Sequence, residues 1–258
     1  MASSPSTLVD TEAGIISLID KIKELPRGTP SLFLDLEGIS LSRHGSLSLL
    51  TIYVLPEACA YLVDVHKLAS ASFTTASPDG TTLKAILESP AITKVFFDVR
   101  NDSDALFAHY GIDLKGIEDV QLMENAARPG RRRYIIGLEK TIQNFAPITL
   151  GQKQDWSVVK DRGVRLFHPT KGGTYEVFNQ RPLDPEVVRY CVNDVQFLPG
   201  LRDKFWSDLS PAWKKRVVEE TEKRVKESQA PGYEPQSQSK KFGPWERMSE
   251  DDLLWGSF

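Results

Sequence analysis

Two apolar segments separated by a very short link constrain the fold most strongly. Residues 46–55 (SLSLLTIYVL) and 60–65 (AYLVDV) each predict a strand, and little more than PEACA joins them. A link of this length suits an antiparallel pair, because parallel strands need a crossover of about a dozen residues or more. Residues 31–38 (SLFLDLEG) predict a strand before this pair, and residues 94–99 (KVFFDV) predict a fourth strand after it.

Helical periodicity surrounds these strands. The predicted helices cover residues 12–25, 81–90, 101–112, 137–147, 183–209 and 211–228. In the fifth helix Asp184 is the expected N-cap, and Pro199 is expected to kink or interrupt it. Residues 113–125 predict a short strand and part of a helix, whereas residues 148–183 show little periodicity and predict a long functional loop. This order predicts an α/β fold: a mixed sheet of about five strands, the first three antiparallel, flanked by helices.

The chain length and composition bound the class of protein. A chain of 258 residues suffices for one large α/β domain with its ends or for two small domains. No apolar run approaches the ~20 residues that span a bilayer, and the N-terminus lacks a basic region followed by an apolar one. The two cysteines, Cys59 and Cys191, have no metal-type spacing. We therefore expect an intracellular protein, cytoplasmic or nuclear, without a membrane segment.

The net charge of −3 conceals an uneven distribution. Residues 1–125 carry 9 Lys/Arg and 17 Asp/Glu, a balance of −8, whereas residues 126–181 carry 11 and 4, a balance of +7. A basic segment inside a mildly acidic chain is consistent with an anion-binding surface, and equally with a solvated loop of long cationic side chains.

Two acids occupy the first predicted strand. Asp35 and Glu37 are two residues apart, so their side chains leave the same face of the sheet. Two like charges side by side on a central strand are costly, and the strand itself carries no cation. Either a divalent cation compensates the charges, or the strand end is exposed and both acids are simply solvated.

Further acids stand at two helical positions. Asp102 and Asp104 open the helix after the fourth strand, where acids are also common as caps. Tyr190 and Asp194 are four residues apart in RYCVNDVQFLPGL (189–201) and share a helical face. Alone, this pair is also explained by a buried tyrosine beside a solvated aspartate.

Taken in order, these motifs resemble the DEDD superfamily of 3′-5′ exonucleases in its tyrosine-bearing subgroup, which includes ribonuclease D and Egalitarian-like proteins. The matching segments are LFLDLEG (32–38), KVFFDVRNDSDAL (94–106) and RYCVNDVQFLPGL (189–201). The histidine subgroup needs a histidine five residues before the last aspartate, and Arg189 stands there instead. The resemblance implies a ribonuclease-H-like exonuclease domain over 30–210, preceded by a helix that packs on it (1–29) and followed by a helix and loose tail (211–258).

The resemblance also implies two divalent ions, Mg²⁺ or Mn²⁺. Asp35, Glu37 and Asp194 would hold the first ion, and Asp35 would bridge to a second ion supported by Asp102, the residue that the alignment selects over Asp104. Tyr190 would orient the attacking water, since a tyrosine pKa of ~10 makes it a poor base at neutral pH. Each cycle would hydrolyse a phosphodiester bond at a 3′ end and release a nucleoside 5′-monophosphate.

The basic segment offers contacts for single-stranded nucleic acid. It contains the motif RPGRRRY (128–134) and ends at GGTYEVFNQRPL (172–183), and the latter segment also resembles Egalitarian-like members. Phosphate contacts are expected from Arg131, Arg132, Arg133 and Lys153, and a contact with the terminal nucleotide from His44. Base stacking or core packing is expected for Tyr134, Trp156, Phe167 and Tyr175. Residue types do not distinguish RNA from DNA, and the expected substrate is RNA in preference to DNA.

Two other functions fit parts of the pattern. A catalytically weak or inactive RNA-binding adaptor of the Egalitarian type needs no intact acid set, yet the four acids and the tyrosine are all present. An unrelated metal-dependent phosphatase needs similar acids but leaves the Tyr190–Asp194 spacing unexplained. The last residues, PWERMSEDDLLWGSF, suggest docking on the domain or on a protein partner.

Overall fold

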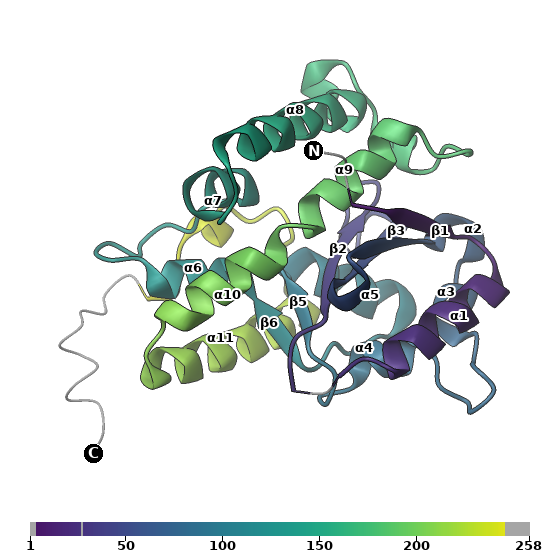
Figure 1. Cartoon of the computed structure of the whole chain (residues 1–258), viewed down its shortest axis with the longest axis horizontal. Helices are drawn as coiled ribbons and strands as arrows, with labels where there is room; N and C mark the ends of the chain where they lie inside the picture. The colour runs from purple at the N-terminus through teal and green to yellow at the C-terminus, as the bar shows by residue number, and fades with distance from the viewer. Residues whose placement is uncertain (1–3, 27, 246–258) are drawn as a thin grey trace.

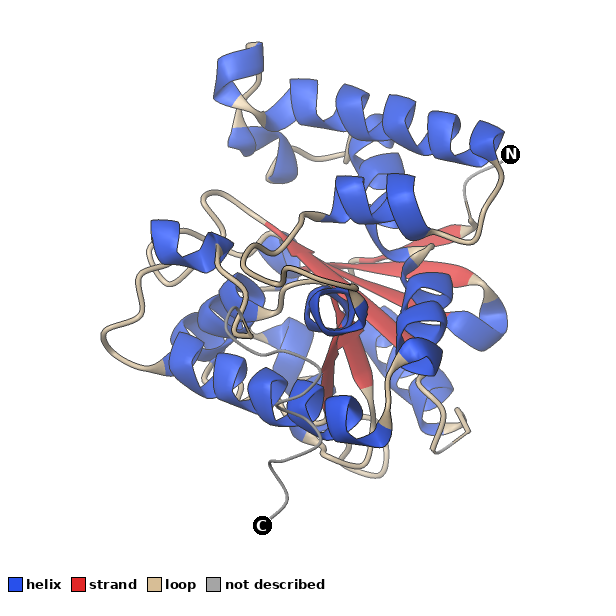
Figure 2. Ribbon diagram, turned by 90° about the vertical axis from the view of Figure 1, so that its left-hand side faces the viewer, coloured by secondary structure: helices blue, strands red, loops and turns tan. Residues whose placement is uncertain are grey.

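A computed structural model describes residues 4–26 and 28–245, and one mixed sheet lies at its centre. The strand order is β1-β4-β3-β2-β5-β6. The strands are β1 (Ser6–Val9), β2 (Leu32–Glu37), β3 (Leu49–Val54), β4 (Cys59–Asp64), β5 (Lys94–Phe96) and β6 (Ile117–Asp119). Helices cover both faces of the sheet (Figures 1 and 2).

The pairing confirms the predicted mixed sheet. Strands β2, β3 and β4 form an antiparallel meander, and β5 and β6 extend it in parallel from β2. The predicted number of about five strands is too low, because β1 adds a parallel edge strand next to β4. Only Val9 of β1 is buried, so this strand lacks the apolar alternation that identified the others.

Helices flank and connect the strands, and α2, α3 and α8 were not among those predicted. The helices are α1 (Glu12–Lys23), α2 (Val65–Leu68), α3 (Ala71–Thr74), α4 (Leu83–Glu88), α5 (Arg100–Tyr110), α6 (Val120–Ala127), α7 (Leu138–Phe145), α8 (Leu150–Phe167), α9 (Pro185–Val195), α10 (Leu198–Asp208) and α11 (Pro211–Gln229). The predicted helix 183–209 is thus interrupted, with Pro199 in the first turn of α10, where a proline is tolerated. Asp184 caps α9 as expected, accepting a hydrogen bond from the Glu186 amide at 2.7 Å.

Two apolar cores lie on opposite faces of the sheet. Alternation along β2 sends Leu34 and Leu36 to the core with α1, α4 and α5, and Phe33 to the core with α9 and α10. Asp35 and Glu37 follow Phe33 in the same alternation, so the sheet directs both acids toward α9, which packs across β2, β3 and β4.

The predicted loop over 148–183 is wrong, since residues 150–167 form α8. Only Trp156 and Gly163 are buried in this helix, and so narrow a buried face leaves little apolar periodicity. A local signal was nevertheless present. Thr149 and Gln152 form a capping box, with reciprocal bonds of 3.2 and 2.8 Å.

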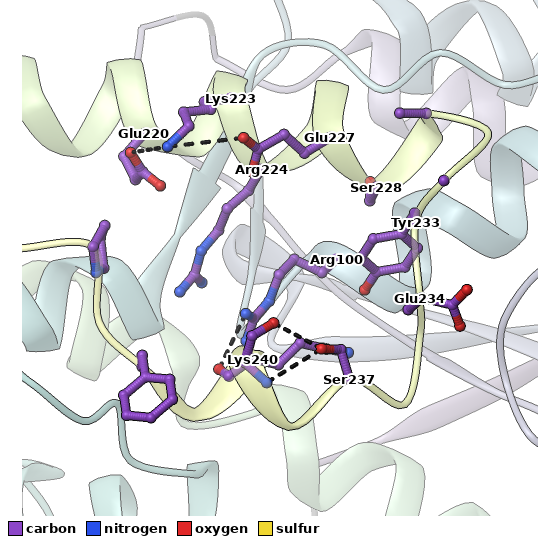
Figure 3. A pocket seen from close by; sticks show the side chains of 15 residues that line it. Arg100, Glu220, Lys223, Arg224, Glu227, Ser228, Tyr233, Glu234, Ser237 and Lys240 are labelled. Carbon is purple, nitrogen blue, oxygen red and sulfur yellow. Dashed lines mark hydrogen bonds and ion pairs between the residues drawn. The ribbon is translucent and has the colours of Figure 1, made fainter.

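The segment after α11 differs from the expected loose tail as far as residue 245. The Tyr233 hydroxyl donates to Asn101 Oδ1 at 2.8 Å. Arg100 Nη1 donates to the Lys240 carbonyl at 3.1 Å (Figure 3). Trp245 packs edge-on against Trp213 of α11, with ring centroids 5.3 Å apart. Residues 231–245 therefore brace the first turn of α5. The docking expected of residues 246–258 lies outside the described residues.

Lys94 is a buried lysine whose protonation makes the stability of the folded protein depend on pH. Its side chain is fully buried and donates to the carbonyls of Ile86 (3.1 Å) and Ser89 (2.7 Å). Burial lowers its pKa to about 7. Between that value and the ordinary lysine pKa the unfolded chain binds more protons than the folded one, so this residue makes the folded state more stable as pH rises.

We predict that wild-type protein gains stability relative to Lys94→Met as pH rises from 7 to 10, because only the wild type carries this linkage. The difference should change by up to about 1.4 kcal/mol per pH unit. Urea unfolding of both proteins at several pH values measures it. A pH-independent difference would show that Lys94 stays charged in the folded protein.

Gly163 sets the approach of α8 to α9. A Cβ at this position would lie 2.3 Å from Cδ2 of the Tyr190 ring, far inside van der Waals contact. We predict that Gly163→Ala lowers the free energy of unfolding by about 1–3 kcal/mol through overpacking. The matched control is Gly151→Ala in the same helix, where the nearest atom is 4.0 Å away, and it should be neutral or slightly stabilising. Chemical denaturation compares the two, and equal effects would contradict this packing.

Candidate functional site

Three carboxylates converge between the sheet and α9. Asp35 and Glu37 leave β2 on the face that α9 covers, and Asp194 lies on α9. Each offers one oxygen within 4.8 Å of the other two. Asp35 and Glu37 retain some exposed surface whereas Asp194 is buried, so the acid cluster is open on the strand side.

Three ionised carboxylates at these distances repel one another, so the cluster is unfavourable without a nearby cation. Removal from water, followed by the charge of Asp194, raises the pKa of Asp35 to about 7. Removal from water and the charge of Asp35 likewise raise the pKa of Glu37 well above its usual range. The described chain therefore holds these carboxylates together at a cost that a bound cation would offset.

The donor set fits a divalent metal ion. Asp194 Oδ1 is buried and has no hydrogen-bond partner among the described residues, although buried carboxylate oxygens are normally satisfied. Carboxylate oxygens are the ligands that Mg²⁺ and Mn²⁺ prefer. A buried, unpartnered oxygen on a member of this carboxylate cluster is what such an ion would bind.

Asp102 lies close to this cluster, whereas Asp104 is paired with Arg43. Burial, then the charge of Asp35, raises the pKa of Asp102 well above its usual range. Asp102 is not one of the three acids whose oxygens lie within 4.8 Å of one another. Both oxygens of Asp104 bind Arg43 instead, from the backbone amide at 2.8 Å and from Nε at 2.6 Å. The geometry thus favours Asp102 over Asp104 as a site residue.

The turn that presents Asp102 is held by Asp119, which sequence reasoning missed. Asp98 has a positive φ of 64°, unusual for a residue with a side chain, and its amide donates to Asp119 Oδ1 at 3.0 Å. Arg224 Nη1 binds the other Asp119 oxygen at 2.8 Å, so α11 completes the support. Asp119 also accepts from the Gln121 amide, and this local N-cap was the one feature visible in the sequence.

Tyr190 and Lys160 complete the arrangement beside Asp194. Tyr190 is 6% exposed, and Lys160 Nζ of α8 donates to its hydroxyl at 2.9 Å. The same ammonium binds Asp194 Oδ2. The sequence pattern predicts a basic loop at Lys160 and gives no sign of this contact, because α8 buries too narrow a face to show helical periodicity.

The residues expected to bind nucleic acid divide into two groups. Arg131 and Arg133 are exposed. Arg132 is 6% exposed and lies inside the protein, with Nε donating to the Ala126 carbonyl at 3.2 Å and its guanidinium 4.5 Å from the Trp213 ring centre. A buried guanidinium with these contacts differs from the expected surface position.

The remaining expected contacts are placed as follows. His44 lies in the loop between β2 and β3, next to the residue that binds Asp104, and Lys153 Nζ donates to the Gln143 carbonyl at 2.8 Å. Tyr134 is 48% exposed, whereas Trp156 is buried and donates to the Asn193 carbonyl. Of the aromatic residues, Trp156 therefore follows the core-packing alternative.

Across residues 4–26 and 28–245, no helix combines the length and apolar character needed to cross a bilayer.

Solved structures resemble this fold over most of the chain. Ribonuclease D of Trypanosoma brucei in complex with RNA U12 matches with a TM-score of 0.69 at 21% identity, covering 88% of this chain and 71% of that one. Escherichia coli ribonuclease D matches with a TM-score of 0.60 at 19% identity, covering 87% and 51%. The mixed sheet with flanking helices is thus a fold of the ribonuclease D type.

Sequence comparison identifies the family. The piRNA biogenesis protein EXD1 of Mus musculus is 36% identical over 190 residues, which cover 67% of this chain and 29% of that protein. The chain therefore spans less than a third of the length of this curated relative. The family model described as 3′-5′ exonuclease matches residues 7–210, most of the described chain. The chain belongs to the 3′-5′ exonuclease family.

Proposed function

We propose that this chain is an active, metal-dependent 3′-5′ exonuclease of the tyrosine-bearing subgroup. It hydrolyses phosphodiester bonds at the 3′ ends of single-stranded nucleic acid and releases nucleoside 5′-monophosphates. The convergence of Asp35, Glu37 and Asp194, with one Asp194 oxygen unpartnered among the described residues, carries the proposal. An adaptor that only bound RNA would not need to keep this repulsive cluster.

The acids would hold two divalent ions, Mg²⁺ or Mn²⁺. Asp35, Glu37 and Asp194 would hold the first ion, and Asp35 and Asp102 would serve the second. Such ions supply a nucleophilic water at neutral pH and stabilise the attacking and leaving oxygens of an in-line displacement. The position of Asp102, near enough to Asp35 for their charges to interact, supports its role.

Tyr190 positions the attacking water and does not remove its proton. Burial, together with the charge of Asp194, raises the pKa of Tyr190 well above its usual range, so the phenol stays protonated at neutral pH. A protonated phenol can orient a water by hydrogen bonding, but it is a poor general base. Its ring is fixed against Phe167, with centroids 5.2 Å apart, which keeps the hydroxyl in place.

The substrate is single-stranded nucleic acid with a free 3′ end, with RNA favoured over DNA. One solved relative is a ribonuclease D bound to RNA, and the curated relative is named for piRNA biogenesis, so both support RNA. Arg131, Arg133 and Lys153 would contact phosphates through their positive charges, and His44 would contact the terminal nucleotide. Arg132 is left out of this set because it is buried.

We predict that Asp35→Asn lowers exonuclease turnover at least about 100-fold, because it removes a negative charge that would help to hold the metal ions. Tyr190→Phe should lower turnover about 10-fold or more with Mn²⁺ binding largely kept. The assay uses Mn²⁺ with single-stranded RNA labelled at its 3′ end and follows labelled mononucleotide; RNA labelled at the 5′ end should shorten stepwise.

The matched control is Asp203→Asn, which makes the same change at a carboxylate that is 70% exposed on α10, and it should keep full activity. If purified wild type and Asp35→Asn bind RNA equally and neither cuts it, the adaptor function replaces the nuclease.

We further predict that Arg131→Ala with Arg133→Ala weakens the salt dependence of RNA binding. Removing two phosphate contacts should reduce the slope of log K against log salt by up to about 1.4, since each contact with a single strand contributes about 0.7. Binding is measured in the Asp35→Asn background to prevent cleavage. Lys204→Ala with Lys215→Ala, which removes two charges from α10 and α11, serves as control. An unaltered slope in the arginine variant would remove these residues from the interface.

A further inference from the structure

Lys160 brings a positive charge from α8 into direct contact with the candidate active site. Its Nζ donates to the Tyr190 hydroxyl at 2.9 Å and to Asp194 Oδ2, and it lies 4.3 Å from the centre of the Tyr190 ring. The lysine side chain is 18% exposed and that of Asp194 is 5% exposed, so water screens their attraction only weakly.

The helix is built to deliver this side chain. Trp156, Lys160 and Gly163 recur at helical spacing and face α9. Trp156 and Asn193 exchange hydrogen bonds of 2.9 and 3.1 Å, which fixes the two helices one turn away from the lysine. One turn after the lysine, Gly163 lets the backbone of α8 approach the Tyr190 ring. The contact is therefore part of a fixed helix packing and does not depend on a mobile surface side chain.

The charge of Lys160 acts on the whole acid cluster. It opposes the rise in the pKa of Asp35 and of Glu37, each of which is driven first by burial. The ammonium of Lys160 is paired directly with the Asp194 carboxylate and hydrogen-bonded to the Tyr190 hydroxyl, which are contacts of a charged lysine. A lysine in this position partly supplies the positive charge that the carboxylates require.

We propose that Lys160 is an internal counter-cation that competes with divalent metal for Asp194 and holds Tyr190 in position. This inference rests on the proposed function, because it assumes that Asp194 is a metal ligand. Without an ion, Lys160 neutralises Asp194 and keeps it directed at Asp35 and Glu37. An ion that binds Asp194 has to share the carboxylate with the ammonium or displace it, which weakens metal affinity and makes the site responsive to metal concentration.

The test is isothermal titration of Mn²⁺ into metal-free protein, with thermal unfolding as a second measurement. We expect Lys160→Met to bind Mn²⁺ at least about 5-fold more tightly than wild type, in the range of ordinary coupling between sites. We also expect its metal-free form to melt at lower temperature, with a larger Mn²⁺-induced rise. Lys215→Met, which removes a charge from an exposed part of α11, is the control and should leave both values unchanged.

Two further variants keep the test decisive. Lys160→Gln removes the charge but keeps a donor for Tyr190, so it should also bind Mn²⁺ more tightly even if Lys160→Met does not fold. Lys160→Arg keeps the charge and should not show tighter binding. If wild type binds Mn²⁺ and folded Lys160→Met or Lys160→Gln binds it no more tightly, the role of Lys160 is wrong but the proposed function is unaffected. No Mn²⁺ binding by wild type would overturn the proposed function instead.

Discussion

Mutual repulsion between carboxylates in a partly dry space is the constraint around which this molecule is arranged. Asp35, Glu37 and Asp194 place oxygens within 4.8 Å of one another, and the pKa of Asp35 rises to about 7 in response to burial and the neighbouring charge. A stable fold keeps such an arrangement only when surrounding structure enforces it and a cation relieves it. The Lys160 ammonium supplies part of that relief, and the unpartnered Asp194 oxygen leaves room for a metal ion to supply the rest.

The fold enforces the arrangement from three directions. Alternation along the central strand β2 fixes the direction of Asp35 and Glu37, and α9 packs over that face and places Asp194 beside them. Helix α8 locks onto α9 through the paired bonds of Trp156 and Asn193. Arg224 of α11 holds Asp119, which in turn holds the turn that leads to Asp102. Segments distant in sequence therefore act on a single small volume.

Much of this was predictable because it depends on local periodicity. The meander of β2, β3 and β4 follows from short links and apolar runs, and the shared face of Asp35 and Glu37 follows from the two-residue period of a strand. What escaped prediction depends on tertiary contacts. Helix α8 buries too narrow a face to show a pattern, the burial of Arg132 depends on Trp213 far along the chain, and the role of Asp119 appears only when α11 packs beside it. The contact of Lys160 with Asp194 is not predictable either, because it depends on the packing of α8 against α9.

Anomalous X-ray diffraction from crystals of this protein soaked in Mn²⁺ would show whether these carboxylates bind metal ions. We expect two manganese peaks among Asp35, Glu37, Asp102 and Asp194, with Asp194 coordinating an ion and the Lys160 ammonium displaced from it or sharing it. Crystals without manganese density at these carboxylates, and with Lys160 still paired to Asp194 at saturating Mn²⁺, would contradict this expectation.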